Sequence, residues 1–375
     1  MAGRPRYTPD ELGQYFDRIG LPRQHRALSV QAPPLRDHND LRLAHLALLL
    51  KHHLVRVPFE NLTQHYSWHG VVDVSPRHVF RKIVLGHGHG HGSNRGGYCM
   101  EANSLFHTVL LSLGYDVYIA GARIYDATSQ RYGGFTHCVN IVTIAGARYM
   151  VDVGFGANGP TRPVPLRSAA AGAGAGAEAE SAVGEHLVIP QIAPASVRLL
   201  HEPIPQQTNQ GCRVWIYQHR IDARADWVPM YCFVDFEFLL EDIRGMNLSP
   251  WRSPHSWFTR KIVTVRFTTD REVLLLPPSS AEEIGDAGGG GWLAKGGATS
   301  TGGDEGAVVE GEIDGAIILF EGTLKWRRGG ETKLEIQFKS EGERLEALER
   351  CFGIVFDEED RDAIRGTVSE ISDTS

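Results

Sequence analysis

Cys99 is a candidate nucleophile because it follows a pair of glycines and precedes a helical pattern. Residues 95–99 read Arg-Gly-Gly-Tyr-Cys, and apolar residues between Leu105 and Leu113 recur at helical spacing. The glycines allow a tight turn and close backbone approach, so Cys99 is expected at the first position of a helix. A thiol at the positive end of a helix is favoured as thiolate. The alternative is a buried structural cysteine, which is how free cysteines are usually found.

His137 and Asp152 are the candidate base and the group that orients it. His137 is expected at the start of a strand, after the glycine pair at 133–134, and Asp152 ends the next strand. A tight turn at 145–147 joins the two strands and places these side chains next to each other. The carboxylate can then fix the imidazole tautomer and support a thiolate–imidazolium pair. Taken singly, the two residues also fit a strand-edge histidine and a turn-capping acid.

Length, charge and cysteine usage narrow the class of protein. The chain has 375 residues and a net charge of −7, so it lacks the broad basic surface of a nucleic-acid-binding protein. No apolar run approaches the roughly 20 residues of a membrane span, and no secretory leader is recognisable. The five cysteines form no CxxC pair, which argues against a disulfide framework or a zinc ribbon. We therefore expect a cytoplasmic protein.

Periodicity predicts helices in the first third and strands after it. Helices are expected from residue 9 to 19, from 41 to 53, from 76 to 85 and from Cys99 to about 113. Strands are expected at 117–124, 138–144, 148–153, 187–189, 197–200 and 213–217. A hairpin around Gly329-Gly330, with arms 316–327 and 332–339, precedes a helix at 343–352. Three low-complexity segments, 86–92, 168–184 and 285–306, are interpreted as flexible surface insertions.

These elements predict an α+β protein with three domains. Residues 1–113 form a helical bundle that ends in the nucleophile helix. Residues 114–228 form an antiparallel β-barrel with the insertion near 168–184. Residues 229–375 comprise an interdomain helical segment and an α/β lid with the insertion near 285–306.

The sequence resembles the arylamine N-acetyltransferase family. The resemblance extends over nearly the whole chain and rests on a combination of motifs. They are Tyr15-Phe16-Asp17-Arg18-Ile19-Gly20, Val57-Pro58-Phe59-Glu60-Asn61-Leu62, Arg95-Gly96-Gly97-Tyr98-Cys99 with Glu101 and Asn103, Thr136-His137, Asp152-Val153-Gly154-Phe155-Gly156 and Ser253-Pro254-His255-Ser256-Trp257-Phe258.

The resemblance implies a helical bundle, a β-barrel and an α/β lid around a cysteine-protease-like or transglutaminase-like core. It also implies ping-pong transfer of an acyl group from acyl-coenzyme A through a Cys99 thioester to an arylamine, arylhydroxylamine or hydrazine, in the service of xenobiotic detoxification. Acetyl- or malonyl-coenzyme A is the co-substrate, without a permanently bound cofactor. The insertions are similar to those of longer members from filamentous fungi, some of which prefer malonyl-coenzyme A.

The resemblance assigns further residues to the site. Glu60 and Arg95 are expected to form a structural ion pair that ties the bundle to the nucleophile turn. Phe155, Gly156 and Phe258 match positions that line the substrate pocket, and Thr136 matches one near coenzyme A. Ordinary core packing is the alternative for the two phenylalanines.

Two other functions use the same residues. One is a thiol hydrolase or transglutaminase-like enzyme with the same Cys-His-Asp triad, and the other is an inactive relative that serves as an interaction protein. We expect no metal site, because His87, His89 and His91 alternate with glycine and lack a fixed geometry. Small-molecule acceptors and acyl-coenzyme A are the expected partners, without nucleic acid, membrane or an obligate protein partner.

Overall fold

The computed structural model describes residues 4–86, 93–167, 187–272 and 311–371. The three low-complexity segments, apart from Gly86, lie outside the described residues, as do His87, His89 and His91. Within the described ranges, no helix has the length and apolar character needed to cross a membrane. The same ranges contain no group of three or more His, Cys, Asp or Glu side chains arranged to hold a metal ion.

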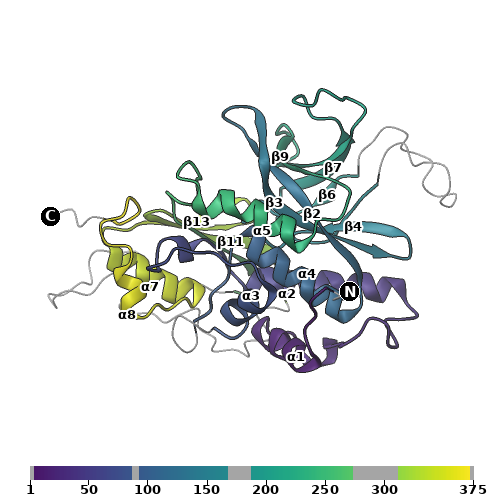
Figure 1. Ribbon diagram of the computed structural model, residues 1–375, viewed down its shortest axis with the longest axis horizontal. Helices are drawn as coiled ribbons and strands as arrows, with labels where there is room; N and C mark the ends of the chain where they lie inside the picture. Colours follow the sequence, from purple (N-terminus) through teal and green to yellow (C-terminus); the bar gives the residue numbers. More distant parts are fainter. Residues whose placement is uncertain (1–3, 87–92, 168–186, 273–310, 372–375) are drawn as a thin grey trace.

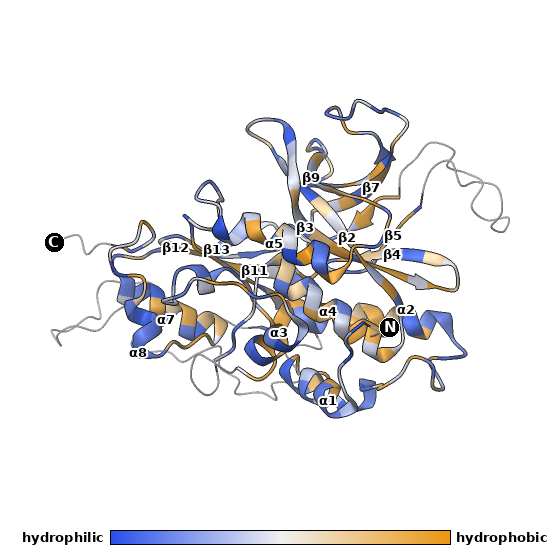
Figure 2. Cartoon of the chain, viewed as in Figure 1, coloured by the Kyte–Doolittle hydropathy of each residue, from blue (hydrophilic) through white to orange (hydrophobic). Residues whose placement is uncertain are grey.

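The N-terminal third is helical and encloses a long buried helix. Its helices are α1 (Pro9–Arg18), α2 (Asn39–Arg56), α3 (Pro76–Ile83) and α4 (Cys99–Leu113). Helix α1 begins with a capping box, in which Thr8 accepts from the Glu11 backbone N–H and the Glu11 side chain accepts from that of Thr8. Helix α4 is apolar on most sides and buried along almost its whole length. It therefore occupies the centre of the molecule (Figure 2).

An eight-stranded antiparallel sheet follows, in the order β5-β4-β3-β2-β9-β8-β7-β6. Its strands are β2 (Asp116–Asp126), β3 (Arg131–Ile144), β4 (Ala147–Val151), β5 (Val164–Pro165), β6 (Ile189–Pro190), β7 (Ser196–Glu202), β8 (Val214–Arg220) and β9 (Val228–Phe233). The sheet curves until its two edges approach each other, where Thr161 donates two hydrogen bonds to the Gln191 side chain, at 2.8 and 2.9 Å. The expected barrel is therefore present in nearly closed form (Figure 1).

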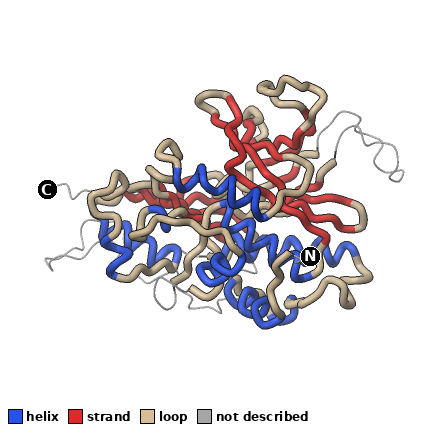
Figure 3. Tube along the Cα trace, viewed as in Figure 1, coloured by secondary structure: helices blue, strands red, loops and turns tan. Residues whose placement is uncertain are grey.

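Helix α5 (Leu240–Arg252) leads from this sheet into a five-stranded one. The second sheet has the order β1-β10-β11-β12-β13 and contains β1 (Phe59–Glu60), β10 (Val263–Thr269), β11 (Ile313–Phe320), β12 (Thr323–Arg328) and β13 (Glu331–Gln337). Helices α7 (Glu341–Phe352) and α8 (Glu358–Asp362) lie at the far end of the molecule from the barrel (Figure 3). Because β1 comes from the helical third, this sheet joins both ends of the chain. The architecture confirms the α+β prediction.

Two details of the expected strands were wrong. His137 does not begin a strand, because β3 starts at Arg131 and runs through Gly133 and Gly134. The segment 316–327 is not one strand but parts of two, β11 and β12, which pair through a turn at Glu321-Gly322. Glu321 adopts a φ of 54°, a conformation that is uncommon for a residue other than glycine, so the turn residue itself is atypical.

Candidate active site

Cys99 is the first residue of α4 and is only 3% exposed. The Glu101 carboxylate caps this end of the helix by accepting from the Tyr98 backbone N–H at 3.2 Å. Gly154 packs directly on the same turn: a Cβ atom there would lie 2.7 Å from Cys99 Cα. Only glycine permits this approach, which brings the segment after Asp152 against the start of the helix.

His137 and Asp152 contact each other from neighbouring strands. The β3–β4 register pairs Asn140 with Val151, so Asp152, just past β4, lies diagonally from His137. Diagonal neighbours on one face of a sheet are within reach of long side chains. The His137 Nε2 and Asp152 Oδ2 atoms are 2.8 Å apart, and both side chains are buried.

The Cys99 thiol is the other group that acts on the His137 imidazole. Because Nε2 faces Asp152, the ring nitrogen available to the sulfur is Nδ1. Burial disfavours the charged imidazole, but Asp152 and Cys99 outweigh burial and raise the pKa of His137 to about 10. Burial likewise acts to raise the pKa of Asp152, but His137, Asn103 and a backbone N–H lower it below its ordinary value. The arrangement therefore holds a protonated imidazole between two acidic groups.

Asn103 fixes the aspartate, a role that the sequence did not reveal. Its Nδ2 donates to Asp152 Oδ1 at 2.9 Å and to the Cys138 carbonyl at 2.8 Å, and its Oδ1 accepts from the Val153 backbone N–H at 3.1 Å. Gly154 N–H also donates to Asp152 Oδ1, at 2.8 Å. Asn103 lies one turn after Cys99 on α4, on the same face of the helix. This spacing was the one feature of the sequence that could have indicated its place in the site.

Aromatic rings pack against His137 and against Tyr98, the residue before Cys99. The Phe155 and Tyr231 rings pack against His137, with centroid separations of 5.4 and 4.9 Å. Phe258 packs against Tyr98 and Phe59, at 5.4 and 6.3 Å. Neither Tyr231 nor Phe59 had been singled out as a candidate site residue.

The other two predicted pocket residues lie beside these rings. The Thr136 carbonyl oxygen is 3.5 Å from Cys99 Sγ. Gly156 has a φ of +80°, and a Cβ atom there would be 3.6 Å from the Phe59 ring. Thr136 therefore contacts Cys99, whereas Gly156 lies at the Phe59 ring.

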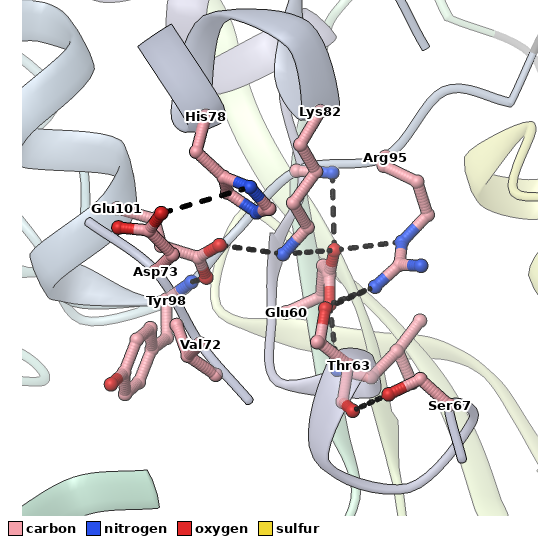
Figure 4. Close-up of polar contacts among 12 residues, drawn as sticks. Glu60, Thr63, Ser67, Val72, Asp73, His78, Lys82, Arg95, Tyr98 and Glu101 are labelled. Atoms are coloured by element: carbon pink, nitrogen blue, oxygen red, sulfur yellow. Dashed lines mark hydrogen bonds and ion pairs between the residues drawn. The ribbon is translucent and has the colours of Figure 1, made fainter. Parts of the chain in front are cut away.

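Glu60 and Arg95 meet in a fully buried cluster behind the nucleophile turn (Figure 4). Arg95 Nε lies 3.0 Å from Glu60 Oε1, and its Nη2 lies 3.3 Å from Oε2. Lys82, which the sequence did not suggest, is 3.6 Å from Glu60 and 2.8 Å from Glu101. Gly96 donates its N–H to Glu60, and a Cβ atom on Gly96 would collide with the Pro58 carbonyl oxygen at 1.7 Å.

The cluster joins two cations to two carboxylates. Burial opposes ionisation of Glu60, but Arg95 and Lys82 outweigh it and lower the pKa of Glu60 to about 2. Burial raises the pKa of Glu101, with Lys82 acting against it. Since Glu60 lies in β1 and Glu101 in α4, these charges hold the sheet that joins both ends of the chain to the nucleophile helix.

We expect the substitution Glu60→Ala to destabilise the protein strongly. It would leave Arg95 and Lys82 buried with a single carboxylate, and removal of one partner from a buried ion pair costs about 3–5 kcal/mol. The free energy of unfolding, measured by urea titration, should fall by that amount.

Glu335→Ala is the matched control for this measurement. Glu335 pairs with Lys325 at 2.9 Å, but both side chains are about half exposed. Loss of an exposed pair should change the free energy of unfolding by less than about 1 kcal/mol. Equal stability of Glu60→Ala and Glu335→Ala would contradict a structural role for the buried cluster.

Comparisons with known proteins indicate the class of enzyme. A family model described as N-acetyltransferase matches residues 42–178, which contain Cys99, His137 and Asp152. An N-malonyltransferase, FDB2, from Fusarium pseudograminearum is 28% identical over 96% of this chain and 93% of its own length. The liver isozyme of chicken arylamine N-acetyltransferase is 35% identical over 40% of this chain and 44% of its own length.

The chain is thus similar to an N-malonyltransferase and to arylamine N-acetyltransferases. It is therefore an acyltransferase, as the sequence motifs predicted. The fold of this acyltransferase is similar to that of the arylamine N-acetyltransferase from Mycobacterium abscessus, with a TM-score of 0.65, 20% identity and 97% of both chains covered. The enzyme from Mycobacterium marinum in complex with CoA gives a TM-score of 0.62, with 21% identity over 96% of this chain and 99% of that one.

Proposed function

We propose that this acyltransferase moves a malonyl or acetyl group from acyl-coenzyme A to the nitrogen of an aromatic amine, through a thioester on Cys99. The observation that carries the proposal is the buried, hydrogen-bonded His137–Asp152 pair, together with Cys99 at the first position of α4. In this proposal Cys99 reacts as the thiolate, which is the nucleophilic form of cysteine.

In the first half-reaction, the Cys99 thiolate attacks the thioester carbonyl of the donor. The sulfur–carbon bond forms and the carbonyl becomes a tetrahedral oxyanion. The backbone N–H of Cys99, at the helix start, is the proposed donor to that oxygen. Collapse of the intermediate breaks the bond to coenzyme A, whose sulfur leaves and takes the proton from His137.

In the second half-reaction, the amine nitrogen attacks the Cys99 thioester. An aromatic amine is largely unprotonated near neutral pH, so its lone pair is available. His137, now neutral, takes the proton that the nitrogen releases as the amide forms. The Cys99 thiolate leaves and pairs again with the protonated imidazole. Donor and acceptor thus use one site in turn, which is a ping-pong mechanism. Capping of the nitrogen in this way would suit detoxification of aromatic amines.

We favour malonyl-coenzyme A as the donor because the FDB2 relative, which spans nearly the whole chain, is named an N-malonyltransferase. An arginine could pair with the malonyl carboxylate, but Arg131 is not that arginine in this proposal. It lies at the start of β3, six residues before His137, which is about 20 Å along an extended strand. A malonyl carboxylate is only two bonds from the transferred carbonyl carbon.

Release of coenzyme A tests the proposed function. With a substituted aniline as acceptor, we expect amine-dependent release, faster from malonyl- than from acetyl-coenzyme A, and parallel lines in double-reciprocal plots. An alkyl amine serves as the acceptor control, and Cys212→Ala, which alters an exposed cysteine, serves as the protein control for Cys99→Ala. Release that does not depend on the amine would indicate a hydrolase and contradict the proposal.

A further inference from the structure

A cavity lies beside the middle and the end of α4, beyond its first turn. It has a volume of about 210 Å³ and is bounded by the N-terminal segment, α4, β2 and the beginning of α5. Its lining includes Ser104, His107, Leu111, Ile119, Leu239 and Ile243. None of the candidate active-site residues belongs to the lining, so this cavity is separate from the proposed site of acyl transfer.

Ser104 gives the cavity an unused polar group. Its side chain is 94% buried, and its hydroxyl has no hydrogen-bond partner. Buried hydroxyls are normally hydrogen-bonded, because an unsatisfied one loses its solvation without compensation. The neighbouring Thr108 hydroxyl donates to the Ser104 carbonyl at 2.9 Å and keeps its capacity to accept. A ligand hydroxyl in the cavity would find both a donor and an acceptor there.

Charges around the cavity favour an uncharged ligand. Arg4 is already engaged: it pairs with Glu237, donates to the Phe238 carbonyl at 2.8 Å and lies 3.2 Å from His107 Nε2. Burial and Arg4 lower the pKa of His107 to about 4, so that side chain is neutral at pH 7. Glu241 in the lining disfavours an anion, and the Arg4 guanidinium disfavours a cation.

The size and walls of the cavity fit one aromatic ring. An apolar cavity of about 150 Å³ in another protein accommodates benzene, so about 210 Å³ leaves room for a ring with one small substituent. Leu111, Ile119 and Ile243 provide apolar surface for the ring, and Ser104 lies in the same wall. We propose that this cavity is a binding site for a small uncharged phenol, with the ligand hydroxyl on Ser104 and the ring against the apolar walls.

Phenol itself is the probe for this site. Saturation-transfer NMR and calorimetric titration of the full chain should detect one binding event that the acyl-transfer reaction does not require. In Leu239→Trp, the indole should fill the cavity mouth and abolish binding. Leu248→Trp is the matched control, since Leu248 is also an exposed leucine of the α5 region, 51% exposed against 55% for Leu239, and is not part of the lining. Binding by Leu248→Trp should match the wild type.

Ser104→Ala separates ligand binding from folding. Since the Ser104 hydroxyl has no partner in the protein, its removal should leave the melting temperature unchanged or slightly raised. The same variant should bind phenol about 5- to 10-fold more weakly, which corresponds to one lost hydrogen bond. Absence of phenol binding by the wild type, or unchanged binding by both Leu239→Trp and Ser104→Ala, would overturn the proposal.

Discussion

The substitution Asp152→Asn should lower kcat by about 10³- to 10⁴-fold while leaving the fold intact. Two donors, Asn103 Nδ2 and the Gly154 N–H, both point at Asp152 Oδ1 and would hold the amide oxygen of the new side chain there. The amide NH₂ would then face His137 Nε2 and donate to it. That hydrogen bond forces the imidazole proton onto Nδ1, beside Cys99, so the ring can no longer take a proton from the thiol.

Asp235→Asn is the control for this experiment. Asp235 also accepts several side-chain hydrogen bonds at the end of a strand, from Tyr118, Arg148 and Trp215, and is not in contact with Cys99 or His137. Its substitution should leave kcat within about 2-fold of the wild type. Steady-state rates with the same amine and donor provide the measurement. Similar rates for Asp152→Asn and the wild type would remove Asp152 from the proposed mechanism.

Mild acid should unfold the protein well before the carboxylates are protonated. Burial is the largest cause that lowers the pKa of five histidines to about 3 or 4: His45, His52, His53, His65 and His107. The ordinary pKa of histidine is about 6.5. Between pH 6.5 and 4, these histidines are therefore protonated in the unfolded chain but stay neutral in the folded protein. The free energy of unfolding therefore decreases as the pH is lowered from 6.5 to 4.

The expected loss between pH 7 and pH 5 is about 5–10 kcal/mol, because each such group contributes about 1.4 kcal/mol per pH unit. His137 opposes this loss only slightly, since its raised pKa contributes stability that is fully present below pH 6.5 and is lost progressively as the pH rises from 6.5 to about 10. Asp360, whose pKa burial raises to about 6, offsets part of it by binding a proton in the folded state.

Urea titrations at pH 7 and pH 5 measure this effect directly. His53→Gln should make the free energy of unfolding less dependent on pH, by the equivalent of about one proton taken up on unfolding, because one of the five histidines is removed. His255→Gln, at an exposed position, is the control and should leave the slope unchanged. Equal free energies of unfolding at pH 7 and pH 5 would contradict the prediction that these histidines stay neutral in the folded state.

The sequence predicted the helical and hairpin elements that carry strong local signals. Cys99 begins α4 as expected, and β3 and β4 are joined at Ala145 and Gly146, both with positive φ as a two-residue hairpin turn requires. The start of β3 was placed too late, because Gly133 and Gly134 normally indicate a turn. Here both glycines lie at an irregularity of the β2–β3 ladder, between the pairs Tyr125–Tyr132 and Arg123–Phe135, and the strand continues on either side of them.

Within the candidate site, residue types were predictable but the groups that position them were not. Glu60 and Arg95 meet as the family motif implied. Lys82 completes that cluster from α3, where a lysine on an otherwise ordinary helix gives no sign of burial. Asn103 was noticed only as part of a motif, because its hydrogen bonds to Asp152 and Val153 depend on how α4 packs against the barrel.

The intact mass of the protein after brief mixing with malonyl- or acetyl-coenzyme A tests the proposed covalent step most directly. We expect one malonyl or acetyl group added to the wild type and to Cys212→Ala, none added to Cys99→Ala, and loss of the group when an aniline is supplied. An unmodified wild type with either donor, although coenzyme A is released when an amine is present, would show that transfer does not pass through Cys99.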